Sequence, residues 1–149
     1  MVRLSVPGTL LHRDVVLRVV AAVCRLVRTN PDIEQEAGRR RLADDFDDKV
    51  VSAVGEAFSN VVVHAYSGAR RGDVELTLEF DHDSLRIRMF DTGKSFDLAA
   101  EPAPALDTLP ESHLGLLIIR ACMDEVSYQA GLAPSPNILT LTKRYLARD

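Results

Sequence analysis

Hydrophobic and polar positions follow two different periods along the chain, and these periods separate predicted strands from predicted helices. Residues 2–6 alternate between apolar and polar side chains, as a short half-buried strand does. A helical period then covers residues 10–28, and Asn30-Pro31 predicts its end. The apolar positions of this helix are Val15, Val16, Val19, Val20, Val23, Leu26 and Val27.

A polar connector without clear periodicity, residues 31–43, leads into a second and longer helix. Asp44 or Asp45 can cap its N-terminus, and the acidic residues around them suit the positive end of the helix dipole. The helix is predicted to reach about Tyr66, with Gly68 just beyond its C-terminus. Its core contacts are expected from Val50, Val54, Phe58, Val61, Val62 and Ala65.

Strict alternation in the next stretch predicts an antiparallel hairpin. Residues 74–80 and 85–89 place apolar side chains on one face and set Glu against Arg on the other. Alternation this regular is typical of a sheet with one face on the core.

The remaining elements complete the predicted architecture. A long segment with three prolines, residues 97–112, precedes a helix that begins near Leu114. A strand within MDEVSYQ and a final strand at residues 138–146 follow. The predicted fold class is α+β: one domain over residues 1–149, a two-layer sandwich with helices on one face of a mixed, largely antiparallel sheet.

Length and composition bound the function only broadly. The chain has 149 residues, of which 46% are hydrophobic and 27% charged, as in an ordinary soluble globular domain. A net charge of −4 gives no general attraction to nucleic acid or to an anionic membrane. No apolar run reaches the roughly 18 residues that span a bilayer. Cys24 and Cys122 stand far apart and are interpreted as core residues, which favours a cytoplasmic location.

The stretch GEAFSNVVVHAY (55–66) raises the question of chemistry, because Glu56, Asn60 and His64 recur every four residues in an otherwise apolar helix. Four residues turn a helix by about 400°, so these side chains are predicted to share one face. Such a row can be the solvated edge of an amphipathic helix. It can also be a site, since a carboxylate accepts protons and an Asn carbonyl oxygen suits Mg²⁺. His64 is assigned no catalytic role.

Three motifs resemble those of one known family. Glu56-x-x-x-Asn60 followed by His64-Ala65-Tyr66 resembles the N box of the GHKL ATP-binding superfamily, in its anti-sigma factor serine/threonine kinase branch. Asp91-Thr92-Gly93 followed by Ser95-Phe96-Asp97 resembles the G1 box. Leu114-Gly115-Leu116, with Met123-Asp124-Glu125-Val126 after it, resembles the G2 region and its following strand. The motifs keep the family order across nearly the whole chain, which implies the histidine kinase-like ATPase (Bergerat) fold.

The resemblance implies a role for each matched residue, with ATP and Mg²⁺ as the cofactors. Glu56 would be the general base toward the attacking Ser or Thr, and Asn60 would bind the Mg²⁺ that bridges the phosphates. Asp91 would accept a hydrogen bond from the adenine amino group, and Gly93 would let the purine approach the backbone. Gly115, at the start of a helix, would offer backbone N–H groups to phosphate.

The segment 97–112 would be the ATP lid of the family, and two departures from the family pattern lie beyond it. The family carries a glycine two residues before Gly115, where this chain has His113. The family also carries Gly-Thr before its last strand, to frame the adenine, where this chain has Asn137-Ile138. Either Thr140 or Thr142 is an alternative substitute for that threonine. These departures concern nucleotide affinity and turnover rather than the fold.

The resemblance implies an enzyme of partner-switching control. An ATP- and Mg²⁺-dependent kinase would phosphorylate a Ser or Thr on a STAS-type anti-anti-sigma partner and would sequester a sigma factor, so that transcription is controlled indirectly. A homodimer is implied as well, with no direct contact to nucleic acid or membrane.

The sequence leaves three alternatives to this kinase. A non-catalytic partner-binding module of the same fold is favoured by His113 and disfavoured by the retained Glu56. A sensor histidine kinase domain is disfavoured, because no phosphoacceptor helical hairpin is evident and the N box continues as HAY. DNA binding is disfavoured by the acidic net charge and by the absence of tryptophan.

Overall fold

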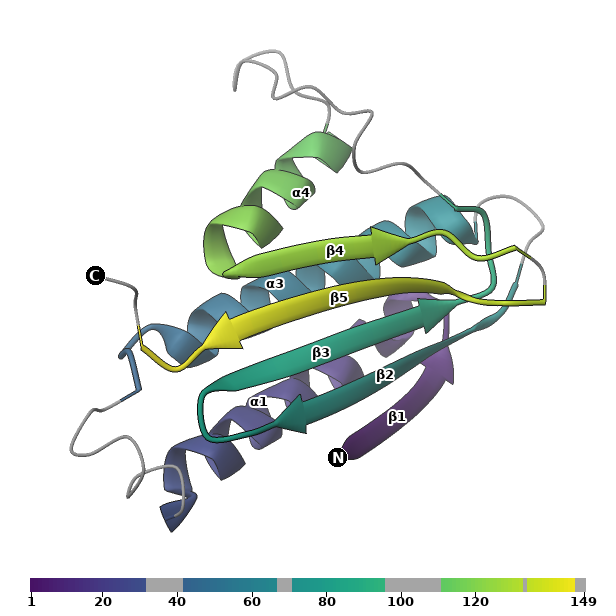
Figure 1. The fold of residues 1–149 in the computed structure, drawn as a ribbon. Coiled ribbons are helices and arrows are strands. Elements are labelled where there is room, and N and C mark those ends of the chain that lie inside the picture. Colours follow the sequence, from purple (N-terminus) through teal and green to yellow (C-terminus); the bar gives the residue numbers. More distant parts are fainter. Residues whose placement is uncertain (32–41, 67–70, 96–110, 133, 147–149) are drawn as a thin grey trace.

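The computed structural model describes residues 1–31, 42–66, 71–95, 111–132 and 134–146, and Figure 1 shows how their elements are arranged. The side chains of residues 111–113 lie outside this description. The elements form two layers, a sheet at the front of Figure 1 and helices behind it.

The sheet has five described strands in the order β1-β2-β3-β5-β4. They are β1 (Val2–Pro7), β2 (Asp73–Phe80), β3 (Ser84–Asp91), β4 (Glu125–Gln129) and β5 (Asn137–Arg144). Each of the four pairings between these strands is antiparallel. The predicted α+β sandwich with helices on one face is therefore confirmed.

The predicted hairpin corresponds to β2 and β3, whose register follows the alternation of the sequence. Glu79 lies opposite Arg86, and Leu78 lies opposite Ile87 on the buried face. On the other face Arg88 also approaches Glu79, with 3.6 Å between guanidinium nitrogen and carboxylate oxygen. Since a cross-strand charge pair is worth about 0.2–1 kcal/mol, the core face rather than the charges fixes the register.

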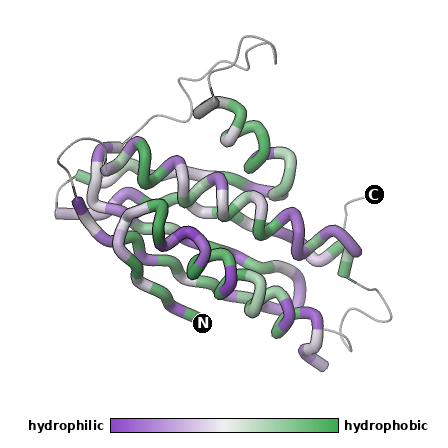
Figure 2. The backbone as a smooth tube through the Cα atoms, turned by 180° about the vertical axis from the view of Figure 1, so that it is seen from behind, coloured by the Kyte–Doolittle hydropathy of each residue, from purple (hydrophilic) through white to green (hydrophobic). Residues whose placement is uncertain are grey.

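Helices form the second layer. They are the short 3₁₀ turn η1 (Leu10–His12), α1 (Arg13–Thr29), α3 (Phe46–Asn60), its π-helical continuation η2 (Val61–Ala65) and α4 (Glu111–Cys122). Figure 2, seen from the helix side, shows hydrophilic and hydrophobic segments alternating along α1 and α3, as in amphipathic helices. Both helices pack against each other, and α4 packs against α3.

One hydrophobic cluster joins the two layers. From α3, Val50, Val54 and Phe58 are fully buried, and they face sheet residues such as Leu76 and Ile87. Burying a side chain of this size contributes about 1.5–3 kcal/mol. The helices within the described ranges are all too short or too polar to serve as a membrane span.

The structure corrects several details of the predicted helices. Asp45 occupies the N-cap position of α3 but makes no capping hydrogen bond, because its carboxylate pairs with Lys49 at 2.9 Å. Val15 and Leu26, expected in the core stripe of the first helix, are exposed. The last helix begins at Glu111, before the predicted start. Gly68 and residues 97–110 of the expected lid lie outside the described residues.

Candidate functional site

The polar row of the sequence lies on α3, at the side that α4 covers. Glu56 and Asn60 are both half-buried, whereas their neighbours Gly55, Ala57 and Phe58 are buried. A carboxylate and an amide therefore border the interior, and neither belongs to a fully solvated edge. This position favours the site interpretation of the row over the interpretation as a solvated face.

Gly115 of α4 lies directly against both of these side chains. A β-carbon on Gly115 would stand 3.0 Å from Oε2 of Glu56 and 3.4 Å from each terminal atom of the Asn60 amide. Gly115 itself is buried. The structure thus brings three predicted site residues, Glu56, Asn60 and Gly115, into one cluster formed by two different helices.

Helix α3 is held from its other side by Arg13 of α1. The Nε atom of Arg13 donates hydrogen bonds to the carbonyl oxygen of Gly55 at 3.3 Å and to Oγ of Ser59 at 3.0 Å. A β-carbon at Gly55 would stand 2.5 Å from the Arg13 guanidinium, so glycine is needed there for this approach. The residues bonded by Arg13 each precede a member of the polar row, so Arg13 fixes the backbone that carries it.

His64 lies beyond the α-helical part of the row. The α-helix ends at Asn60, and the next five residues form a π-helical turn. The structure therefore corrects the assumption of one uninterrupted α-helix. His64 is exposed, whereas Glu56 and Asn60 are half-buried, and a face shared by all three residues stays a prediction.

Asp91 ends β3 and is almost completely buried, with 3% of its surface exposed. Its Oδ1 atom accepts hydrogen bonds from the backbone N–H of Gly93 at 3.0 Å and from Nδ2 of Asn137 at 2.9 Å. Within the described part of the chain, no donor bonds its other oxygen, Oδ2. A buried carboxylate oxygen that lacks a donor is an acceptor available to a ligand.

Burial raises the pKa of Asp91 above its ordinary value, because a charged carboxylate loses its hydration there. The hydrogen bonds from Asn137 and from the Gly93 backbone oppose this effect and lower the pKa. The charge state of Asp91 is thus set by a balance between the apolar surroundings and two donors.

Gly93 is required by a close contact that the sequence did not indicate. A β-carbon on Gly93 would collide with the carbonyl group of Ala65, the last residue of η2. The next residue, Lys94, donates its backbone N–H to the same Ala65 oxygen at 3.0 Å. These contacts attach the turn after Asp91 to the end of the helix that carries Asn60, so both halves of the site share one end of that helix. The expected role of Gly93 toward a purine remains a prediction beside this structural one.

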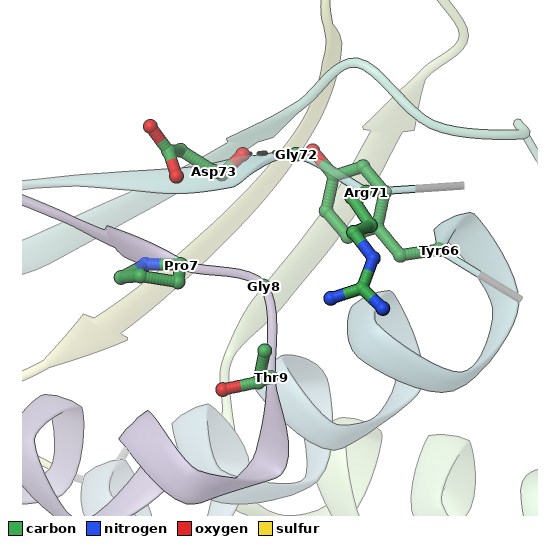
Figure 3. A pocket seen from close by; sticks show the side chains of 7 residues that line it. All are labelled: Pro7, Gly8, Thr9, Tyr66, Arg71, Gly72 and Asp73. Atoms are coloured by element: carbon green, nitrogen blue, oxygen red, sulfur yellow. Dashed lines mark hydrogen bonds between the residues drawn. The ribbon is translucent and has the colours of Figure 1, made fainter. Parts of the chain in front are cut away.

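Tyr66 connects the same turn to the sheet. Its hydroxyl accepts the backbone N–H of Thr92 at 3.1 Å and donates to the carbonyl oxygen of Asp73 at 2.7 Å. The Tyr66 ring also lines a pocket of about 480 Å³, shown in Figure 3. The pocket lies beside the candidate site rather than within it, and it is lined by Pro7, Gly8, Thr9, Tyr66, Arg71, Gly72 and Asp73.

Asn137 is the site residue that sequence reasoning missed. It was noted only as a departure from a family pattern, yet its side chain is 3% exposed and bonds Asp91 directly. The pairing of the strands is what could have identified Asn137, because the register of β3 and β5 places it opposite Asp91.

The other departures from the family pattern lie elsewhere. Thr142, considered as a substitute for the family threonine, pairs with Arg86 near the other end of β3. The side chain of His113 lies outside the described residues.

The donor set near Asn60 suits Mg²⁺ only in part. Glu56 and Asn60 offer oxygen atoms on one helix face, which is the ligand type that Mg²⁺ prefers. No group of three or more His, Cys, Asp or Glu side chains that could hold a metal occurs in the described ranges. A magnesium ion here would take its remaining ligands from phosphates and water, as Mg²⁺ often does in phosphoryl-transfer sites.

Comparisons with known proteins agree with this arrangement. The family model described as the histidine kinase-like ATPase domain matches residues 11–143. Serine-protein kinase RsbW of Bacillus velezensis is 35% identical over 95 residues, which cover 58% of this chain and 59% of that protein. RsbW of Bacillus subtilis is 34% identical over 94 residues, 58% of each chain. RsbW of Staphylococcus epidermidis is 37% identical over 93 residues, 56% of this chain and 58% of that protein. The chain thus spans less than two thirds of the length of these relatives.

Proposed function

Because the chain belongs to the histidine kinase-like ATPase domain family, we propose that it is an anti-sigma factor serine/threonine kinase. It binds ATP with Mg²⁺ and transfers the γ-phosphoryl group to a Ser or Thr of a STAS-type anti-anti-sigma protein. The similarity to proteins named serine-protein kinase RsbW supports the kinase assignment.

One observation carries the proposal: Gly115 of α4 packs on Glu56 and Asn60 of α3, while the buried carboxylate of Asp91 stands beyond the end of the same helix. A nucleotide needs a hydrogen-bond acceptor for the amino group of its base, and a metal ligand and N–H donors for its phosphates. Asp91 can serve as the acceptor, and Asn60 with the backbone near Gly115 can serve the phosphates. The turn between Asp91 and Lys94 is bonded to Ala65 at the end of η2.

At the base end, Asp91 accepts a hydrogen bond from the adenine amino group through Oδ2. The buried position of Asp91 strengthens this bond, because a hydrogen bond between buried groups faces less competition from water. The ring of the base approaches the Gly93 backbone on the side away from Ala65, because the Ala65 carbonyl takes the space that a Gly93 side chain would fill.

At the phosphate end, the side-chain oxygen of Asn60 holds Mg²⁺, and the backbone N–H groups at the start of α4 near Gly115 face the phosphates. The ion neutralises negative charge on the phosphates when it is bound. A side chain at position 115 would press on the ends of Glu56 and Asn60, so glycine leaves these two groups room beside the phosphates.

Glu56 accepts the proton of the attacking Ser or Thr hydroxyl. Phosphoryl transfer depends mainly on positioning and charge stabilisation, so the base mainly orients the nucleophile. Glu56 is half-buried, and Arg13 holds the helix that carries it through hydrogen bonds to Gly55 and Ser59.

The proposal includes the partners as well as the reaction. The protein acts as a homodimer in the cytoplasm, binds a sigma factor, and releases or retains it according to the phosphorylation of its STAS-type partner. The free thiols of Cys24 and Cys122 are compatible with a reducing compartment.

The test is phosphoryl transfer from labelled ATP to a purified STAS-type protein, with wild type and Glu56→Gln compared. This substitution keeps the size of the side chain and removes the proton acceptor, so we expect a loss of about 10²–10⁴-fold in transfer rate with ATP affinity retained. Glu79→Gln, on the open face of the sheet, is the matched control and leaves the rate unchanged.

Two results contradict this proposal in different ways. Transfer by Glu56→Gln at the wild-type rate would remove Glu56 from the chemistry. No transfer by wild type, with tight binding of the partner, would instead support the alternative of a non-catalytic binding module, which His113 favours.

A further inference from the structure

Asn137 controls the hydrogen bonding of Asp91. Its Nδ2 group donates to Oδ1 of Asp91 at 2.9 Å and to the carbonyl oxygen of Gly93 at 3.0 Å. Its own Oδ1 accepts the backbone N–H of Gly131 at 2.9 Å. The reversed amide would set oxygen against two acceptors and N–H groups against a donor, so this network fixes the orientation of the Asn137 side chain.

The same contacts leave Asn137 with no donor for a ligand. Both protons of its Nδ2 group are used, one on Asp91 and one on Gly93. On Asp91, both donors converge on Oδ1, and Oδ2 receives none from the described residues. Any direct contact of this pair with a ligand therefore runs through Oδ2 of Asp91.

We propose that Asn137 is a positioning residue for base recognition: it holds the Asp91 carboxyl group turned so that Oδ2 alone meets the ligand. The inference rests on the proposed function, because the ligand it concerns is the base of a bound nucleotide. A base that presents an amino group, as adenine does, satisfies Oδ2. A base that presents a carbonyl oxygen, as guanine does, meets a second acceptor and is rejected.

The electrostatics of Asp91 agree with this geometry. Burial raises its pKa, and the hydrogen bond from Asn137 is the largest contribution that lowers it again. Without that donor, Asp91 takes up a proton more readily and becomes a donor itself. The discrimination between an amino group and a carbonyl oxygen would then weaken.

The decisive variant is Asn137→Asp, which keeps the shape of the side chain and the acceptor for the Gly131 N–H. It replaces the donor to Asp91 by a second carboxylate. At low pH a shared proton restores a hydrogen bond between the two carboxyl groups, and at high pH the two charges repel. Two buried carboxylates also destabilise the fold as the pH rises, so the unfolding free energy of the variant is measured at each pH and affinities are compared only where the protein is folded.

The first measurement is the affinity for ATP with Mg²⁺, as the ratio of variant to wild type at each pH. For Asn137→Asp we expect near-wild-type affinity at about pH 5, and binding about tenfold weaker at about pH 8, as for a lost bond to a charged group. The preference for ATP over GTP should shrink in the same variant. Asn137→Thr, which keeps a hydroxyl donor, should show a ratio that is constant with pH.

The second measurement needs no nucleotide. A carbon-13 titration of the Asp91 carboxyl in the free protein should show a higher pKa in Asn137→Asp than in wild type. An affinity ratio that is constant with pH, together with an unchanged Asp91 titration, would overturn the proposal. If wild type binds no ATP while the Asp91 titration still shifts, Asn137 orients Asp91, but the proposed kinase function fails and the role in base recognition fails with it.

Discussion

Gly115 and Glu56 are in contact across the two helices of the candidate site: a β-carbon on Gly115 would stand 3.0 Å from Oε2 of Glu56. The two residues are far apart in the sequence, and each was singled out by a separate motif. Helices α3 and α4 therefore bound the space beside the Glu56 carboxylate together. A larger side chain at position 115 should displace the Glu56 side chain first.

Gly115→Ala should slow phosphoryl transfer by about tenfold or more with little loss of stability. The added methyl group displaces the end of the Glu56 side chain, and a misplacement of about 1 Å can cost 10²-fold in rate. Alanine favours the helix by up to about 1 kcal/mol, which offsets the strain. The measurements are the transfer rate and urea unfolding.

Arg120→Ala is the control for this change. It introduces alanine at an exposed position of the same helix, and five residues turn an α-helix by about 500°, so position 120 lies on a different face from Gly115. Its transfer rate should equal that of wild type. Equal rates for Gly115→Ala and wild type would show that the contact with Glu56 has no part in the reaction.

Gly93→Ala should destabilise the protein by about 1–3 kcal/mol, as overpacking in a fixed environment does. The new β-carbon would collide with the backbone of Ala65, which cannot move aside as a side chain could. Lys94→Ala, at the exposed neighbouring position, should change stability by less than about 0.5 kcal/mol. Thermal and urea unfolding measure both, and a stable Gly93→Ala would contradict the described contact.

Tyr66→Phe should weaken ATP binding as well as stability. The variant loses the hydroxyl that joins the Thr92 backbone to the Asp73 carbonyl, so the turn after Asp91 is less constrained. The stability loss should be about 1–3 kcal/mol, the usual cost of an unpaired buried group.

Tyr145→Phe is the matched control for Tyr66→Phe. Its hydroxyl also bonds two backbone groups, the carbonyl oxygens of Asp81 and Ser84, but at the hairpin turn of β2 and β3. We expect a comparable loss of stability with unchanged ATP affinity, measured by calorimetry. If both variants lower ATP affinity equally, the effect of Tyr66 is one of general stability.

Asp91→Asn should change how stability depends on pH. Because burial raises the pKa of Asp91, the folded state holds its proton at pH values where the unfolded state has lost it. Wild type therefore loses stability as the pH rises from the ordinary value of 3.8 through the raised value in the folded protein. Asparagine lacks this titration, so the free energy of unfolding of the variant relative to wild type should increase over that range.

Urea unfolding at several pH values between about 4 and 7 measures this difference. A constant difference between variant and wild type would show that Asp91 titrates in the folded protein as it does in the unfolded chain. The same variant should lose ATP binding, since its amide presents a donor where the adenine amino group needs an acceptor.

The parts of the fold that could be predicted from the sequence are the elements in which hydrophobic residues repeat with a single strand or helix period. The alternation from Val74 to Met89 predicted the β2–β3 hairpin and its face, because a slip of one residue would expose every core side chain. The buried stripe of α3 followed in the same way from Val50 to Phe58. The uninterrupted α-helix expected up to about Tyr66 was wrong beyond Asn60, since nothing in the apolar run Val61–Val63 indicates a π-helical turn.

The site residues that could be predicted belong to short sequence motifs. The contacts between these residues depend on helix packing and strand pairing, which local sequence patterns do not show. Glu56 and Asn60 were identified from their spacing, but only the packing of α4 shows that Gly115 meets them. Asn137 carries no signal of its own, because its contact with Asp91 arises from the β3–β5 register and the turn at Gly131. Contacts between segments remote in sequence are the part that local patterns cannot supply.

The central claim is that Asp91 and Asn60 belong to one nucleotide site, and titration calorimetry with and without Mg²⁺ tests it most directly. Wild type should bind ATP in preference to GTP and more tightly with Mg²⁺. Asn60→Ala should lose the gain from Mg²⁺, and Asp91→Asn should lose ATP binding altogether. Wild type that gives no binding heat with ATP, or Asn60→Ala with an undiminished response to Mg²⁺, would contradict the account.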